Sequence, residues 1–345
     1  MSINGKGGAC VVRELSLAEI FQLGYYWETK ILLTAVKLDI FSALRDQPRT
    51  ALELAESLQL DDSALRLLLH ALVAMRVLRK EGDRFSNTSV GQQYLVRTSP
   101  DYVGHLLILH DAEWANWGRL EDAIRTGKSP ATQHVFATNP ELGAQVLAVL
   151  DRIGQASGPH LAKRLKLSGI TRMLDVGGGA ATNAIAFCRE YPELEVTVLD
   201  LPATLGLAKE AVRRAGLTER IHLLPGDFLT DSFQGRYEMI FMSDILHYQA
   251  PPTNAWLVRK AYDHLESGGR LVVKDRFLDP SRTSPAWTTA FAVHILVNTE
   301  HGQCVTSEEV QEWMRQAGFT AVEELEPCAV VQGLKPSKPE GQDHG

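Results

Sequence analysis

The sequence has few cysteines and no long apolar run. Among 345 residues there are four widely separated cysteines, Cys10, Cys188, Cys304 and Cys328. That number and spacing exclude a disulfide framework and a C-x-x-C metal site. Apolar runs such as Leu106–Leu109 are too short to cross a bilayer, and the first residues lack the apolar core of a signal peptide. We therefore expect a cytoplasmic protein that contacts no membrane.

An excess of positive charge is also missing. The formal net charge is −7 at pH 7, whereas a nucleic-acid-binding protein needs a basic face for phosphates. With 45% hydrophobic and 22% charged residues, the composition is that of a globular protein. The length favours two structural units over one. We expect no nucleic-acid partner.

Helical spacing of apolar residues dominates residues 15–158. One such pattern runs from Ile31 to Leu44. Thr50 and Glu53 form the capping-box pattern of a helix start, and Ser63–Met75 predicts a leucine-rich helix.

Two short apolar segments, residues 77–79 and 84–86, follow and predict a hairpin. Helix, turn, helix and hairpin together predict a winged helix within residues 14–100. A helix that reads DNA exposes polar and basic residues at its start. Here Ser63–Met75 is filled with leucine and follows two aspartates. The sequence favours a packing or dimerisation module over a DNA reader.

Short strands alternate with helices from Arg172 onward, which predicts a parallel α/β sheet with ligands at the carboxyl ends of its strands. The expected strands are Met173–Val176, Glu195–Leu199, Ile221–Leu224, Met239–Met242 and Arg270–Lys274. The expected helices are Asn183–Glu190, Thr204–Ala215 and Thr253–Leu265. We place a helical connector at 101–165, the α/β domain at 166–334 and a disordered tail at 335–345. Residues 1–13 are also expected to be disordered.

The candidate cofactor site lies at the ends of the first three strands. Gly177-Gly178-Gly179 follows the first strand and lets a ligand approach the backbone at a helix start. Asp200 ends the second strand, where a carboxylate can accept the hydroxyls of a ribose. Asp227 and Phe228 follow the third, and they offer a carboxylate for an adenine amino group and a ring for the purine.

With these motifs, the chain resembles the plant- and bacterial-type small-molecule O-methyltransferases over residues 15–330. The resemblance implies a Rossmann-like class I methyltransferase domain, S-adenosyl-L-methionine as cofactor and a homodimer formed through the N-terminal helical domain. It implies that the cofactor is held by Gly177, Asp200, Leu201, Asp227, Phe228 and Ser243. Ala181 departs from the family's Gly-Gly-Gly-x-Gly turn, where an alanine can be accommodated if that residue is already helical.

The resemblance also identifies catalytic candidates. Ser243-Asp244-Ile245-Leu246-His247 matches the family segment that ends in the catalytic histidine. An imidazole can take the proton of a phenol or enol. Asp275, after the next strand, fits the family's carboxylate. Two departures are Tyr248-Gln249, where the family has Asp-Trp, and Cys304, where it has a second carboxylate.

Acceptor contacts are expected from both halves of the chain. Connector residues 101–165 should cover the acceptor, with Trp114 and Trp117 against a flat ring. Asp244 and His294 are predicted to bind it too. About half of these tryptophans and of Tyr25, Tyr26 and Trp27 would instead serve the core or a dimer interface. His247 and His294 could hold a metal, but His294 as part of the acceptor site is favoured, and we predict no metal.

Three functions are open at this stage. The first is O-methylation of an aromatic or polyketide-like hydroxyl with His247 as base. The second is C-methylation, including a metal-assisted version on a 2-oxo acid, or loss of methyl transfer in a relative that still binds the cofactor. The third, a winged-helix regulator, is disfavoured by the leucine-filled helix.

Overall fold

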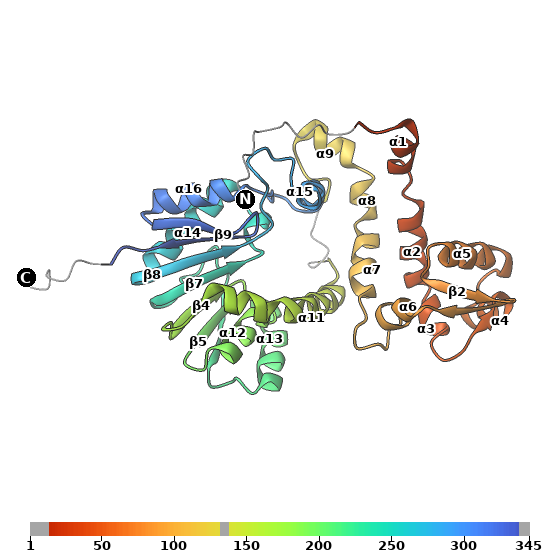
Figure 1. Ribbon diagram of the computed structural model, residues 1–345, viewed down its shortest axis with the longest axis horizontal. Coiled ribbons are helices and arrows are strands. Elements are labelled where there is room, and N and C mark those ends of the chain that lie inside the picture. Colours follow the sequence, from red (N-terminus) through yellow and green to blue (C-terminus); the bar gives the residue numbers. More distant parts are fainter. Residues whose placement is uncertain (1–13, 132–137, 338–345) are drawn as a thin grey trace, which may run out of the picture. The chain divides into compact units, whose positions relative to one another are not determined.

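The computed structural model describes residues 14–131 and 138–337 and divides the chain into two compact units, Met1–Asp111 and Ala112–Gly345 (Figure 1). The helices between residue 112 and residue 165 thus group with the sheet. Disorder is predicted for residues 1–13 and 335–345, of which 1–13 and 338–345 lie outside the described residues. Lys335, at the start of the predicted tail, is instead anchored, since its backbone N–H donates to the Gly269 carbonyl at 2.7 Å.

The N-terminal unit is mostly helical. Its elements are α1 (Leu17–Leu23), α2 (Trp27–Lys37), α3 (Ile40–Ala43), β1 (Arg49–Thr50), α4 (Ala51–Leu58), α5 (Asp62–Ala74), β2 (Leu78–Glu81), β3 (Arg84–Asn87), α6 (Ser89–Tyr94) and α7 (Gly104–Ala112), which ends at the boundary. The sheet order is β1-β3-β2, with antiparallel pairs.

The predicted winged-helix order of helix, turn, helix and hairpin is confirmed. The Thr50 side chain accepts from the Glu53 backbone N–H, and the Glu53 side chain accepts from that of Thr50, as in a capping box. Helix α5 buries Leu65, Leu69 and Leu72 in the core of this unit. Most leucines of this helix therefore serve packing.

The helical spacing from Ile31 to Leu44 is confirmed, and it is divided between α2 and α3 because Asp39 adopts a left-handed conformation with φ of 57°. An aspartate tolerates that conformation better than most residues. The chain turns there, and the apolar residues of α2 and α3 still meet in one core.

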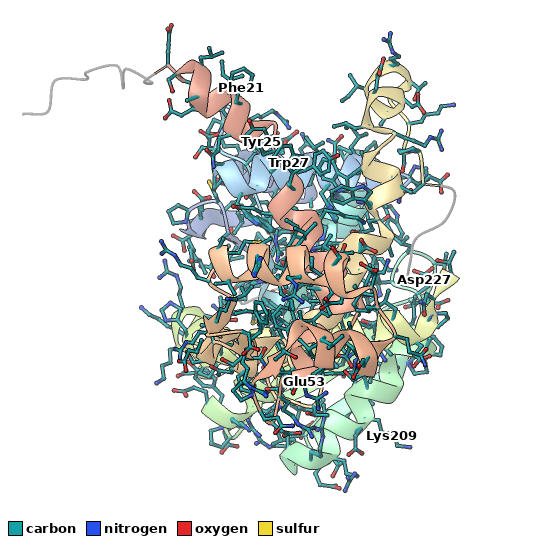
Figure 2. The ribbon with its side chains drawn as sticks, turned by 90° about the vertical axis from the view of Figure 1, so that its right-hand side faces the viewer. Phe21, Tyr25, Trp27, Glu53, Lys209 and Asp227 are labelled. Carbon is teal, nitrogen blue, oxygen red and sulfur yellow. The ribbon has the colours of Figure 1, made fainter. Side chains whose placement is uncertain are left out.

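Helix α1 has no buried residue. Leu17, Phe21, Leu23 and Trp27 are each more than half exposed within this chain. Figure 2 shows Phe21, Tyr25 and Trp27 projecting from α1 and the start of α2. A row of large apolar side chains is thus left uncovered by the rest of the N-terminal unit.

The C-terminal unit is built around a seven-stranded sheet of order β6-β5-β4-β7-β8-β10-β9. Its strands are β4 (Arg172–Val176), β5 (Glu195–Asp200), β6 (Ile221–Pro225), β7 (Tyr237–Ser243), β8 (Leu265–Lys274), β9 (Thr320–Glu326) and β10 (Val330–Leu334). Its helices are α8 (Trp114–Trp117), α9 (Leu120–Thr126), α11 (Pro140–Leu165), α12 (Thr182–Glu190), α13 (Pro202–Ala215), η1 (Leu246–Tyr248), α14 (Pro251–His264), α15 (Ala286–Asn298) and α16 (Ser307–Ala317).

Both faces of the sheet are covered by helices. In β7 successive residues point to opposite faces. Met239 and Phe241 pack with residues of α11, α12 and α13, whereas Ile240 and Met242 pack with residues of α14 and α16. Because both faces are buried, the central strands read as continuous apolar runs.

The five predicted strands are all present and mutually parallel. Strands β9 and β10 were not predicted; β10 pairs with both β8 and β9 in antiparallel fashion. Strand β9 carries three glutamates and lies at the edge of the sheet, where charged side chains hinder pairing with a further strand. Among the described residues, no helix is long and apolar enough to cross a membrane.

Candidate active site

The glycine turn lies between β4 and α12 and is closely packed. Gly177 has φ of +68°, and a Cβ atom there would lie 2.6 Å from Ile245 Cγ2. At Gly178 a Cβ would lie 2.7 Å from Asp175 Oδ2. Both positions therefore require glycine, which keeps the backbone accessible at the end of β4.

Asp175 is buried beneath this turn, and neither carboxylate oxygen has a hydrogen-bond partner. Burial, reinforced by the charge of Asp200, raises the pKa of Asp175 to about 7. A buried carboxylate without a partner is costly. It fits a site whose ligand brings positive charge and donors, as the amino group and sulfonium of S-adenosylmethionine do.

Asp200 is fixed at the end of β5. Its Oδ2 accepts from the Gly179 backbone N–H at 2.8 Å, and its Oδ1 accepts from that of Leu201 at 2.7 Å. Leu201 is 51% exposed, so its side chain is available beside the carboxylate. The remaining lone pairs of Asp200 can still accept the two hydroxyls of a ribose.

The third loop joins the same edge of the sheet, since the Gly226 N–H donates to the Asp200 carbonyl at 3.0 Å. Asp227 Oδ1 accepts from the Leu229 N–H at 2.8 Å. Phe228 Cε1 lies 3.5 Å from the position that a Cβ of Gly177 would take. The ring predicted to pack on adenine is thus next to the glycine turn.

The condition for an alanine at position 181, a helical backbone, is not met. Ala181 has φ of 63° and ψ of 24°, a left-handed conformation, and it is the N-cap of α12. This conformation explains why the resembling family has glycine there. An alanine pays strain of about 1–2 kcal/mol in such a position.

Ser243 and Asp244 lie at the end of β7 in a polar cluster. Asp244, with φ of 57°, receives Lys274 Nζ and Arg276 Nη1, each at 2.5 Å, on its two oxygens. Ser243 Oγ donates to Asp244 at 2.8 Å and lies 3.3 Å from Lys274 Nζ. The two cations lower the pKa of Asp244 and outweigh the raising effect of its burial. Asp244 is therefore an anchored anion, and its contact with the acceptor stays a prediction.

His247 and Asp275 are brought together as a buried pair. His247 Nδ1 lies 2.6 Å from Asp275 Oδ1, and the two side chains are 4% and 2% exposed. Asp275 also accepts from the backbone N–H groups of Leu246, His247 and Arg276 at 2.7–3.3 Å. A carboxylate so satisfied acts as acceptor for Nδ1–H, which leaves Nε2 of the neutral imidazole as the basic nitrogen.

The backbone at His247 is held from two further sides. Helix η1 carries His247, and the buried Asn254 side chain donates to the Leu246 carbonyl at 3.0 Å. A Cβ at Gly302 would lie only 2.5 Å from the His247 carbonyl oxygen. Because Gly302 has no side chain, the loop after α15 can pack directly on η1, the short helix that carries His247.

Cys304 does not supply the missing second carboxylate. It is 3% exposed, and burial, with the charge of Asp275, raises the pKa of its thiol to about 12. The thiol is neutral at physiological pH. The only carboxylate that hydrogen-bonds the His247 side chain among the described residues is thus Asp275.

Aromatic rings extend from His247 along one side of α15. Phe291 stands edge-on to His247, 5.2 Å between ring centroids, and stacks on Trp287 at 5.0 Å and on His294 at 5.7 Å. Trp117 lies 6.2 Å from His294, since α8 packs against α15. We call Trp117, Trp287, Phe291 and His294 the aromatic surface. A hollow of about 530 Å³ near Pro280 and Glu308 contains none of the predicted site residues.

Sequence reasoning missed one member of this region. Glu113 is 3% exposed and lies with its Oε2 3.8 Å from His294 Nε2. Nothing in its local sequence distinguishes it from a surface glutamate before a short helix. Within the described ranges, no group of three or more His, Cys, Asp or Glu could hold a metal.

Family models match both units of the chain. Residues 21–97 match the O-methyltransferase dimerisation domain, and residues 117–320 match the O-methyltransferase domain. A 3-hydroxy-5-methyl-1-naphthoate 3-O-methyltransferase of Streptomyces sahachiroi is 30% identical over 90% of this chain and 92% of its own. The N,N-dimethyltransferase OxyT of Streptomyces rimosus is 30% identical over 85% of this chain and 88% of its own. The solved structure of PigF with SAH, a Serratia protein, has a TM-score of 0.86 at 23% identity, covering 93% of this chain and all of that one.

Fold and glycine turn define a class I α/β methyltransferase with an N-terminal helical dimerisation domain. More narrowly, the chain belongs to the O-methyltransferase family. The predictions of family, fold class, enzyme class and S-adenosylmethionine as cofactor are thereby confirmed. The domain boundaries, the roles of single residues and the absence of a nucleic-acid partner stay predictions.

Proposed function

We propose that this methyltransferase methylates a hydroxyl group of an aromatic or polyketide-like small molecule, with His247 as general base. The observation that carries the proposal is the 2.6 Å contact between His247 Nδ1 and Asp275 Oδ1. It orients the imidazole and leaves Nε2 as the proton acceptor. The aromatic surface next to His247 suits a flat acceptor.

The cofactor supplies an electrophilic methyl group on a sulfonium. The chain's own residues then have two tasks, positioning and proton removal. Gly177 and Gly178 give access to the backbone, Asp200 receives the ribose hydroxyls, and Asp227 with Phe228 receives the adenine. Ser243 and Leu201 complete the proposed contacts. His247 takes the hydroxyl proton as the oxygen attacks in line, and Asp275 stabilises the resulting imidazolium.

The proposed acceptor site uses Trp117 and His294 of the aromatic surface, with Trp114 beside them on α8. Asp244 lies within the cluster of Lys274 and Arg276, and the Arg276 guanidinium lies over the Trp287 and Phe291 rings, 5.1 Å and 5.2 Å from their centroids. This cluster holds two cations and one anion, so it is suited to an acceptor with an acidic or electron-rich oxygen.

We also propose a homodimer formed through α1 and α2. Leu17 is 68% exposed, Phe21 57% and Leu23 76%, and so many exposed large apolar side chains on one short helix indicate an interaction surface. Replacing Leu17 and Phe21 by serine should give a monomer in light scattering. A dimer that survives this change would place the interface elsewhere.

A transfer assay with labelled S-adenosylmethionine and hydroxylated naphthoates, anthraquinones and 2-oxo acids tests the function. His247→Ala should lose at least about a hundredfold in turnover while calorimetry still detects cofactor binding. His160→Ala, at an exposed histidine of α11, is the matched control. Full activity of His247→Ala would remove the base from the mechanism. A product methylated on nitrogen or carbon would favour the other chemistries of this family over O-methylation.

A further inference from the structure

Glu113 is a buried acid that the proposed reaction does not use. It precedes α8, its side chain is 5% exposed, and its Oε2 has no hydrogen-bond partner. Burial raises its pKa to about 7. A buried carboxyl oxygen without a hydrogen-bond partner lowers the free energy of unfolding unless a ligand hydrogen-bonds to it.

The side chain that faces Glu113 is His294, at 3.8 Å between Oε2 and Nε2. That distance is too long for a hydrogen bond but too short for the two groups to be independent. The carboxyl oxygen and the imidazole nitrogen thus point at one region. His294 is 24% exposed, so a ligand can reach it.

Two side-chain amides, those of Asn116 and Asn298, determine which ring nitrogen of His294 carries the hydrogen. The Asn298 Nδ2 donates to the His294 carbonyl at 3.0 Å, and its Oδ1 accepts from Asn116 Nδ2 at 2.9 Å. A carbonyl only accepts, so the nitrogen of the Asn298 amide must be the atom near His294. The same nitrogen lies 3.2 Å from His294 Nδ1. Nδ1 is therefore the acceptor, and neutral His294 carries its hydrogen on Nε2, toward Glu113.

Phe291 links this pair to the catalytic histidine. Its ring is 5.2 Å from His247 and 5.7 Å from His294, with His294 nearly parallel to it at 19°. Both imidazoles therefore lie beside one aromatic ring on α15. The Arg276 guanidinium lies over the Phe291 ring, 5.2 Å from its centroid. A planar acceptor beside Phe291 with one hydroxyl at His247 would extend toward His294.

We propose that Glu113 and His294 form a second polar recognition point, which binds an oxygen of a fused-ring aromatic acceptor on a ring other than the one that carries the methylated hydroxyl. His294 Nε2–H donates to this oxygen, a carbonyl or quinone oxygen by preference, because the nitrogen that faces the region is a donor. Glu113 is a positioning residue: the charge of its carboxylate, with Oε2 3.8 Å from Nε2, favours the tautomer that carries its hydrogen on Nε2. The inference rests on the proposed function and specifies an acceptor with a second oxygen on another ring of the fused system.

The consequence is discrimination between acceptors. A site that hydrogen-bonds a substrate oxygen rejects an analogue without it, since buried polar groups are then left unpaired. A substitution that only destabilised the fold would weaken the binding of the acceptor and of its analogue by the same factor. The ratio of the two dissociation constants therefore distinguishes recognition of the oxygen from a general structural defect.

The test is calorimetric binding, in the presence of S-adenosylhomocysteine, of a hydroxylated anthraquinone and of the matching hydroxyanthracene, which lacks the quinone oxygens. The full-length protein should prefer the quinone by about tenfold or more. His294→Phe, which keeps the ring stacked on Phe291, should weaken quinone binding about tenfold and leave hydroxyanthracene binding within about twofold. Glu113→Gln should reduce the preference in the same direction, by about threefold. Phe291→Leu is the control that should weaken both.

Equal losses for both ligands in His294→Phe, or no preference in the unaltered protein, would overturn the inference. These outcomes do not depend on turnover. If the quinone binds with the expected preference but receives no methyl group on oxygen, the proposed function fails while the recognition point stands. If hydroxyanthracene and quinone are both methylated with equal KM, the recognition point fails alone.

Discussion

Asp275 accepts the Nδ1–H of His247 through the same oxygen that accepts the backbone N–H of Arg276, at 2.6 Å and 2.7 Å. Its other oxygen accepts from the N–H groups of Leu246 and His247. The backbone N–H groups of Leu246, His247 and Arg276 thus orient the Asp275 side chain, which in turn orients the His247 imidazole. Through these hydrogen bonds, η1 and the residues that follow β8 form one unit.

Asp275→Asn should lower kcat by about 10³-fold, because the amide can present its NH₂ to Nδ1 and thereby stabilise the wrong tautomer. Cofactor affinity should stay within about twofold. Steady-state kinetics and calorimetry check this pair of results. Asp263→Asn, at an exposed acid of α14, is the control. An active Asp275→Asn protein would show that the orientation of His247 does not depend on this carboxylate.

Gly302→Ala should impair catalysis without a change in any catalytic group. The new methyl group would lie 2.5 Å from the His247 carbonyl oxygen, so the loop or the histidine has to move. A misplacement of about 1 Å costs about a hundredfold in rate. The measurement is kcat, with calorimetry showing that the cofactor still binds. Unchanged kcat would mean that the loop yields and His247 does not.

Ala181→Gly tests the backbone of the cofactor turn. Release of the left-handed strain should raise the free energy of unfolding by about 1–2 kcal/mol. Loss of the buried methyl group and the greater entropy of glycine in the unfolded chain should each lower it by about 0.8 kcal/mol. We expect nearly unchanged stability in denaturant unfolding. Ala180→Gly, whose φ is not positive, bears the costs without the gain and should be destabilised by about 1–2 kcal/mol. Equal destabilisation of the two variants would contradict the strain at Ala181.

Asp200→Ala should weaken binding of S-adenosylmethionine by about 2 kcal/mol, or roughly thirtyfold, through loss of charged hydrogen bonds to ribose. Calorimetry measures the change. Glu210→Ala, an exposed acid on α13 paired with Arg213, should bind as the unaltered protein does. If Asp200→Ala retained full affinity, the ribose contact would have to be assigned to another residue.

Glu113→Gln should make stability less sensitive to pH. The folded protein raises the pKa of Glu113 from its ordinary 4.5 to about 7, so folding disfavours the charged form. The contribution of Glu113 to the free energy of unfolding is therefore fully present below pH 4.5. It is lost as the pH rises toward 7, by at most about 3 kcal/mol. The variant, which does not titrate, should therefore gain on the unaltered protein between these values. Urea unfolding at pH 5 and pH 8 measures this difference, and Glu121→Gln is the exposed control.

Much of the fold is predictable because its signals are local. The strands from Met173 to Lys274 are apolar on both faces, and the capping box at Thr50 and Glu53 marks a helix start. Strand β9 was missed because an edge strand with glutamates lacks that apolar signal. The break at Asp39 was missed because a helical apolar pattern continues across it.

In the site, chain-local motifs placed His247 and Asp275 correctly near each other. They could not identify Glu113, whose importance comes from contacts with residues far along the chain, such as His294. They also could not determine the backbone conformation of Ala181, since the sequence gives residue type but not φ. Burial and partners of polar groups arise from tertiary packing, which a single sequence does not display.

With His247 as the proposed base, the hydrogen bonds that saturate Asp275 also limit the route by which the proton can leave. Four donors already occupy this carboxylate, and His247 is almost completely buried. A proton that reaches Nε2 therefore has no path through Asp275 to the solvent behind it. It has to leave from the same nitrogen and on the same side from which the acceptor came. Departure of the methylated product would then precede deprotonation of the base, and each turnover would end with the opening of the acceptor side to water.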